Sequence, residues 1–170
     1  MNSQKLKAIQ APLKDKYKNE PEAALITLKA RGKISEGITC NIETGKALRE
    51  AGLHPATGGD GMHLCSGDML LEALVACAGV TLNAVATSIG INLTDAEVFA
   101  QGDIDFRGTL AVAKDVSVGF KNIRLGFELI TDANEEQIAS LIKLTERYCV
   151  VYQTLRNSPS IDVSCEVSTP

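Results

Sequence analysis

Two cysteines lie inside apolar stretches and are the residues of this 170-residue chain best suited to chemistry. Cys77 closes the run Leu70-Leu71-Glu72-Ala73-Leu74-Val75-Ala76-Cys77, and Cys149 lies within Arg147-Tyr148-Cys149-Val150-Val151. They are 72 residues apart, too far for a zinc hairpin or a CxxC motif, so only the fold can bring them together. Two buried thiols paired in this way would suit cysteine redox chemistry.

The other cysteines and the histidines indicate no disulfide framework and no metal centre. Five cysteines are an odd number, and we expect a reducing compartment, so no permanent disulfide is predicted. Cys40 and Cys165 are predicted to be strand residues without a chemical role. Cys65 precedes the helix that carries Cys77, where a helix N-terminus lowers a thiol pKa, and a resolving or sensing role stays open for it. The two histidines, His54 and His63, are too few for a metal cage, and we predict neither metal nor cofactor.

Composition narrows the partners that the chain could have. The net charge is −4, with no basic stripe to neutralise phosphates, which argues against nucleic acid. The polar start lacks the apolar core of a signal peptide. The longest apolar run, residues 69–78, is interrupted by Glu72 and is too short to cross a bilayer. We therefore expect a cytoplasmic protein that does not contact a membrane.

The first half of the sequence predicts a helical lead-in, short strands, a loop and one central helix. Residues 1–24 have the apolar spacing of an amphipathic helix, punctuated by Pro12 and Pro21. Residues 25–42 are typical of two or three short strands, with a tight turn at Arg31-Gly32. The Gly-rich segment 43–66 lacks a phosphate-binding motif and is interpreted as a surface loop. The segment 67–89, capped by Ser66 and ended by Gly90, predicts a helix buried on all sides.

The second half predicts strands, two helices and a closing strand. Residues 91–106 and 113–130 alternate between apolar and polar and predict antiparallel strands. Capping residues at 131–136 open a helix that ends near residue 148, and a shorter helix covers 151–155. Residues 161–167 alternate again and predict a last strand. This order indicates an α+β fold, with residues 1–24 as an N-terminal helical extension and 25–168 as a single domain.

The segments around the two cysteines resemble the OsmC/Ohr family of osmotically inducible and organic-hydroperoxide-resistance proteins. The first block, residues 66–77, is similar to the family pattern S-P-x-E-L-L-x-x-A-L-x-x-C. The second block, residues 146–155, is similar to A-E-x-x-C-P-V-x-x-T-L. The Gly-rich loop before the helix and the order of elements also fit, so the resemblance covers about residues 25–168.

This resemblance implies a fold, an assembly and an activity. The fold would have antiparallel sheets wrapped around a buried central helix, in an intertwined homodimer with each active site at the subunit interface. The activity would be thiol-dependent reduction of organic hydroperoxides, with Cys77 as the peroxidatic thiolate and Cys149 as the resolving thiol. A dithiol or a lipoylated protein would return the electrons. An apolar vestibule would favour organic peroxides, because the organic tail gains burial.

Two further site residues follow from the resemblance, and both depart from the family pattern. The arginine that ionises the first thiol would be Arg31, with Lys33 as the substitute. The family glutamate ten residues before the first cysteine is replaced by Gly67, so the adjacent Asp68 would take its role. Glu72 is the poorer candidate, because it lies well round the helix from Cys77. The proline that usually follows the second cysteine is also replaced, here by Val150.

Two other functions stay open beside the peroxidase. A member of the same fold could bind a small hydrophobic ligand or serve a stress role with structural cysteines, and the replaced glutamate keeps this alternative open. A dimeric scaffold protein is a second alternative, but it would leave the paired cysteine blocks unexplained.

Overall fold

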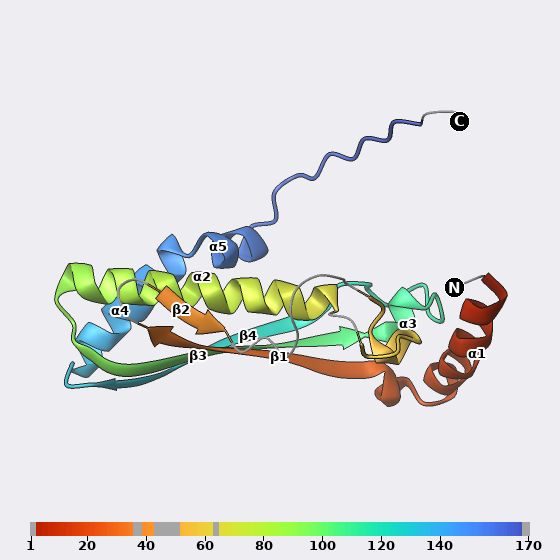
Figure 1. Ribbon diagram of the computed structural model, residues 1–170, viewed down its shortest axis with the longest axis horizontal. Coiled ribbons are helices and arrows are strands. Elements are labelled where there is room, and N and C mark those ends of the chain that lie inside the picture. Colours follow the sequence, from red (N-terminus) through yellow and green to blue (C-terminus); the bar gives the residue numbers. More distant parts are fainter. Residues whose placement is uncertain (1–2, 36–38, 43–51, 63–64, 168–170) are drawn as a thin grey trace.

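In the computed structural model, a single antiparallel sheet lies under one long helix (Figure 1). The structure describes residues 3–35, 39–42, 52–62 and 65–167. The sheet has the order β2-β1-β3-β4, formed by β1 (Leu25–Ser35), β2 (Thr39–Ile42), β3 (Leu93–Asp105) and β4 (Phe120–Thr131). The helices are α1 (Ser3–Asn19), α2 (Ser66–Ile89), α3 (Phe106–Thr109), α4 (Glu135–Tyr148) and α5 (Val150–Arg156), with 3-10 turns η1 (Pro21–Ala24) and η2 (Pro55–Thr57). The predicted α+β class is confirmed.

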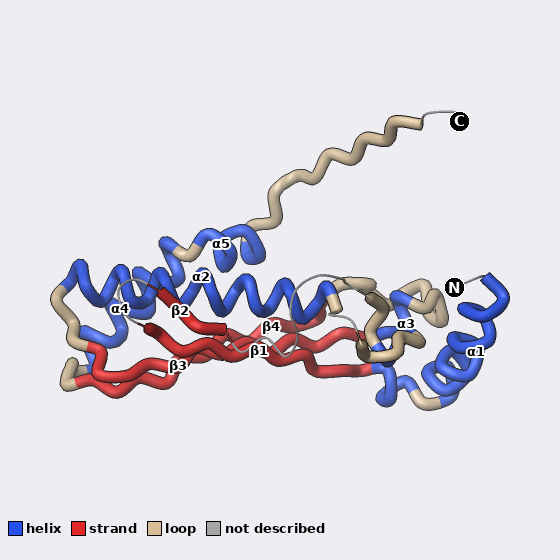
Figure 2. The backbone as a smooth tube through the Cα atoms, in the orientation of Figure 1, coloured by secondary structure: helices blue, strands red, loops and turns tan. Residues whose placement is uncertain are grey.

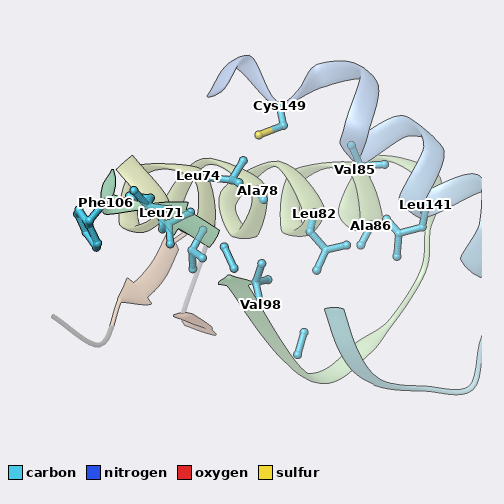
Figure 3. Close-up of a cluster of buried hydrophobic side chains, with 14 of the residues drawn as sticks. Leu71, Leu74, Ala78, Leu82, Val85, Ala86, Val98, Phe106, Leu141 and Cys149 are labelled. Atoms are coloured by element: carbon cyan, nitrogen blue, oxygen red, sulfur yellow. The ribbon is translucent and has the colours of Figure 1, made fainter. Parts of the chain in front are cut away.

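The core lies between the sheet and α2. Every second residue of β3, from Ala96 to Ile104, is buried on the face that meets α2, and the residues between them lie on the opposite face. Leu71, Leu74 and Leu82 of α2 bury their side chains there. Helices α4 and α5 pack against α2 from a different side (Figure 3). Among the described helices α2 alone is long and apolar enough for a membrane span, but here it is the core helix.

Three helix predictions are confirmed. Gly90 ends α2 in the left-handed conformation at φ 75°, and its N–H donates to the carbonyl of Ala86. Helix α4 begins with a capping box in which Asn134 and Gln137 bond each other's backbone N–H. The expected short helix is α5. The cap of α2 differs, because Ser66 is its first residue and Cys65 occupies the N-cap position without a side-chain hydrogen bond.

The strand that carries Arg31 contradicts the predicted turn. Strand β1 runs straight through Arg31 and Gly32, which lie opposite Phe99 and Val98 of β3. Antiparallel pairing with the long β3 along this whole stretch outweighs the tendency of glycine to turn. The predicted helix in residues 1–24 is present, but it passes through Pro12 instead of breaking there.

Helix α1 is attached to the rest of the described chain. The hydroxyl of Tyr17 donates to the carbonyl of Ala56 at 2.7 Å, and the Gln10 side chain donates to the carbonyl of Thr57 at 3.1 Å. The division of the chain into an extension and a domain at residue 24 stays a prediction.

Two expectations for the second half are wrong in detail. Residues 113–119 are turns rather than strand, and the short helix α3 follows β3. The segment 158–167 is extended but pairs with no described strand, and it projects away from the molecule (Figure 2). Ile161, Val163 and Val167 are 83%, 90% and 85% exposed there. An alternating apolar segment forms a strand only beside another strand, and none of the described strands pairs with it.

Helix α2 is also not buried on all sides. Ala73, Val80 and Thr87 are exposed, and Cys77 and Ala84 between them are only half-buried. These five residues recur every three or four positions and therefore form one stripe along the helix, which we call the open stripe of α2. In the described part of one chain, only the start of α5 approaches this stripe, at Cys77, and Ala73, Val80 and Thr87 stay exposed.

Candidate active site

Cys77 lies in the middle of the open stripe of α2, half-buried and reduced. Its neighbours along the helix, Leu74 and Ala78, turn into the core. The hydroxyl of Thr81, one helical turn later, is hydrogen-bonded to the Cys77 sulfur. The periodicity of the helix thus places the thiol at the edge of the core, with one side facing protein and one side facing outward.

Cys149 is fully buried at the junction of two helices. It ends α4, with its N–H donating to the carbonyl of Thr145, and it is the N-cap residue of α5. Its sulfur accepts a hydrogen bond from the N–H of Tyr152 at 3.4 Å. Figure 3 shows this sulfur directed toward α2, near Leu74 and Ala78. The junction between α4 and α5 therefore aims the second thiol at the helix that carries the first.

The fold brings the two predicted cysteines together. Helix α5 packs against α2, and the two free thiols lie near enough to influence each other's ionisation. Thiols brought together by the packing of two helices can form a disulfide, in contrast to cysteines held far apart. The 72-residue separation in sequence is closed because α5 packs against α2.

The environments of the two thiols shift their pKa values in opposite directions. Burial raises the pKa of Cys77, but hydrogen bonds from the Val151 N–H, the Cys149 thiol, the Val150 N–H and Thr81 outweigh it, so the pKa is lowered. Burial raises the pKa of Cys149 to about 11, although the N–H of Tyr152 acts in the opposite direction. Near neutral pH Cys77 is the thiol more readily ionised, and Cys149 stays protonated as its hydrogen-bond donor.

Arg31 is not near Cys77 within one chain. It pairs across the sheet with Phe99, whose face of β3 is the one turned away from α2. Its guanidinium donates to Glu97 at 2.7 Å and lies over the Phe99 ring at 5.7 Å. Lys33 lies on the same face, paired with Asp95 at 2.9 Å.

Asp68 does not reach Cys77 within one chain either. Nine residues along a straight helix correspond to about 13.5 Å and half a rotation, so the two side chains lie on opposite sides of α2. Burial raises the pKa of Asp68 above its ordinary value, although the nearby His54 acts in the opposite direction. Glu72 is buried on the core side, and burial followed by repulsion from Asp68 raises its pKa. A carboxylate beside Cys77 would have to come from elsewhere.

The remaining cysteines lie apart from the pair. Cys65 is twelve residues before Cys77, about 18 Å along α2, and cannot form a disulfide with it within one chain. Cys165 lies in the exposed segment after α5, so its expected strand placement is wrong. Cys40 lies in β2 as expected, but its side chain, like His63, is outside what the structure describes. Within the described residues, no cluster of histidine, cysteine and carboxylate side chains could hold a metal ion.

A groove of about 760 Å³ runs beside the free edge strand β4. Its lining is mixed, with Leu74, Phe127 and Leu155 among the apolar residues and Arg124 and Glu146 among the charged ones. Tyr152, which donates its N–H to Cys149, also lines it, so the groove approaches the thiol pair.

Sequence reasoning missed the donors that act on Cys77. Thr81 lies one turn after Cys77, and its spacing alone could have indicated contact. The N–H groups of Val150 and Val151 carry no signal in residue type, because every residue except proline has one. Only the position of α5 reveals them.

Comparison with known proteins supplies a family and a fold. A model of the OsmC-like protein family matches residues 58–164, more than half of the chain. The chain is similar to the crystal structure of an OsmC-like hydroperoxide resistance protein from Jannaschia sp. CCS1, with a TM-score of 0.61 and 18% identity, covering 86% of this chain and 97% of that one. It is also similar to an OsmC-like protein from Mycoplasma pneumoniae, with a TM-score of 0.51 and 17% identity, covering 79% and 86%. No curated protein matches the sequence significantly.

Proposed function

Because the chain belongs to the OsmC-like protein family, we propose that it is a thiol-dependent peroxidase that reduces organic hydroperoxides. The observation that carries this proposal is the packing of α5, capped by Cys149, against α2, which carries Cys77, with the pKa of Cys77 lowered and that of Cys149 raised. An attacking thiol must be able to ionise to the thiolate. A resolving thiol must lie beside it and stay protonated, so that it does not attack the peroxide itself. The hydroperoxide resistance role of the Jannaschia protein agrees with this stress-related function.

The proposed reaction uses both thiols in order. The Cys77 thiolate attacks an oxygen of the peroxide, the O–O bond breaks, and the alkoxide leaves with a proton as an alcohol. Cys77 is then a sulfenic acid. The thiol of Cys149 attacks this sulfur, forming a Cys77–Cys149 disulfide and releasing water. A dithiol or a lipoylated protein reduces the disulfide by thiol–disulfide exchange and is itself oxidised. This route needs no metal and no bound cofactor, and a reducing compartment such as the cytoplasm would supply its electrons.

We further propose that two copies form an intertwined homodimer. The open stripe of α2 contains Cys77 and consists of small or apolar residues, so a second copy packed there would enclose the thiol. The exposed apolar segment 161–167 and the free edge of β4 are complementary features that a second copy would satisfy. In this assembly Arg31 and Asp68 would act on Cys77 only from the partner, because neither reaches it within one chain.

The test is peroxide consumption with a dithiol reductant. Cumene hydroperoxide and dihydrolipoamide should support turnover by the wild-type protein and by the control C165S, whose cysteine is exposed and unpaired. C77S and C149S should lose at least tenfold in steady-state rate. Wild-type turnover no faster than that of C77S would refute the peroxidase.

A second candidate function is binding of a small hydrophobic ligand, and the groove beside β4 favours it. In that case the cysteines would be structural. Binding of a fluorescent fatty acid that is equal in wild type and C77S, together with absent peroxide turnover, would support this function instead.

A further inference from the structure

The break between α4 and α5 leaves a main-chain group that needs a partner. The last four carbonyl groups of an α-helix have no acceptor role within the helix and must be satisfied in another way. At the end of α4 the carbonyl of Thr145 accepts from the N–H of Cys149 at 2.9 Å. Cys149 is then extended, at φ −71° and ψ 107°, so the helical pattern stops before the next carbonyl, that of Glu146.

The side chain of Gln153 crosses this break. Its Nε2 donates to the carbonyl of Glu146, seven residues earlier in α4, at 2.8 Å. Its main-chain N–H donates to the carbonyl of Cys149 at 2.9 Å, and its Oε1 accepts from the side chain of Asn157 at 3.1 Å. One half-buried residue is thus bonded to the end of α4, to the N-cap of α5 and to the C-cap of α5.

Helix α5 needs such a bond because it has no deeply buried anchor. None of its seven residues, all of which the structure describes, is buried. Val151, Tyr152 and Leu155 pack against the core only in part. Apolar contacts are not directional and hold α5 near α2 without fixing its direction. A hydrogen bond is directional, so the bond from Gln153 to α4 fixes the angle between the two helices.

We propose that Gln153 is a positioning residue for Cys149, because it ties α5 to the end of α4 and so holds the Cys149 sulfur toward Cys77. Cys149 ends one helix and caps the other, so a change in the angle between them moves its side chain. Figure 3 shows its sulfur directed toward α2. A disulfide needs sulfur atoms about 2 Å apart and a narrow range of dihedral angles, so a small rotation at this junction disfavours it.

The experiment equilibrates the reduced protein with a buffer of oxidised and reduced glutathione. Cys77 and Cys149 are oxidised to their disulfide, while one oxidised glutathione is reduced to two molecules of glutathione. Q153M has a side chain of similar length without a donor. It should lower the equilibrium constant for the disulfide by about fivefold to tenfold, as expected for the loss of one hydrogen bond.

Two matched variants separate the donor from other effects. Q153K carries an ammonium group that can still donate to the carbonyl of Glu146, and it should lower the constant by less than Q153M does. T154A changes the exposed neighbour on α5 and should match the wild type. A constant in Q153M equal to that in T154A, or an equal loss in Q153K and Q153M, would overturn the proposal. A lower midpoint of thermal unfolding in Q153M with an unchanged disulfide constant would also overturn it, since Gln153 would then only stabilise the fold.

A measurement on the wild-type protein tests the proposal if Q153M does not fold. Coupling between two equilibria is reciprocal, so a hydrogen bond that favours the disulfide must itself be favoured by the disulfide. Solvent exchange of the Gln153 side-chain amide should therefore be slower in the oxidised than in the reduced protein by about the same factor. Exchange that is equal or faster in the oxidised protein would overturn the proposal.

The effect of Gln153 on the disulfide is independent of the proposed function, whereas its value for peroxide turnover rests on that function. A disulfide constant that falls in Q153M, in a protein without peroxide turnover, would support this inference while refuting the peroxidase. Peroxide turnover with a disulfide constant that is the same in Q153M and wild type would do the reverse.

Discussion

At the scale of single residues, the site depends on an asymmetry between two chemically identical side chains. Cys77 and Cys149 both lose solvent, and burial alone would raise both pKa values. The difference arises because hydrogen bonds to Cys77 outweigh its burial, whereas those from the Tyr152 and Val151 N–H groups do not outweigh the burial of Cys149, which also faces the developing charge of Cys77. A pair arranged in this way separates the attacking role from the resolving role.

This division of roles predicts a trapped intermediate. In C149S the sulfenic acid formed at Cys77 has no partner thiol, so treatment with one equivalent of cumene hydroperoxide should yield a stable dimedone adduct at Cys77. In the wild type the adduct should be at least tenfold weaker, because Cys149 captures the sulfenic acid first. Adduct levels that are equal in both proteins would show that Cys149 does not resolve Cys77.

At the scale of elements, one buried carboxylate ties the end of β3 to its surroundings. Asp105 is 1% exposed and caps α3 through the N–H of Arg107. Its carboxylate also accepts hydrogen bonds from the Arg107 guanidinium and, at 3.3 Å, from Lys121 at the start of β4. The side-chain bond to Arg107 is the main cause that lowers the pKa of Asp105 to about 2.

The substitution D105N should destabilise the protein by about 2 kcal/mol, because it leaves a partly buried arginine without its counterion. The folded-state pKa of Asp105 is below its unfolded value, so its contribution to stability is present above about pH 4 and is lost as the pH falls toward 2. Urea unfolding at pH 7 and pH 3 should show a smaller acid-induced loss for D105N than for wild type. The exposed D132N is the control, and a D105N protein as stable as D132N would contradict this account.

The elements also show what the sequence could predict. Helix α2, its end at Gly90, and the capping box of α4 follow from local patterns, and the structure confirms them. The prediction of a turn at Arg31-Gly32 was wrong because pairing with β3, 66 to 68 residues away in sequence, determines the local conformation. The pairing of Cys77 with Cys149 was available only through resemblance to a family. The N–H donors of α5 were not predictable, since main-chain position has no signature in residue type.

At the scale of the whole molecule, three features of the described residues have no partner among those residues. The open stripe of α2, the edge of β4 and the apolar residues of segment 161–167 all face outward. Burying large apolar side chains that are 83% to 90% exposed would be worth about 1.5 to 3 kcal/mol each. The proposed homodimer accounts for all three features.

The segment 161–167 gives the assembly a specific test. V163D places a charge on the apolar face of the alternating segment and should convert dimer to monomer, as measured by sedimentation velocity. S164D places the same charge on the adjacent residue, which points to the other face of a strand, and should leave the dimer intact. Monomeric wild-type protein, or equal effects of both substitutions, would contradict an exchanged strand.

The pairing of Cys77 with Cys149 as a redox couple is tested most directly by stoichiometric oxidation. The reduced wild-type protein is treated with one equivalent of cumene hydroperoxide per chain, and disulfide-linked peptides are quantified by mass spectrometry. We predict one Cys77–Cys149 disulfide per peroxide consumed, with Cys65 and Cys165 remaining free thiols. Peroxide that is consumed without this disulfide, or a disulfide that joins other cysteines, would contradict the account.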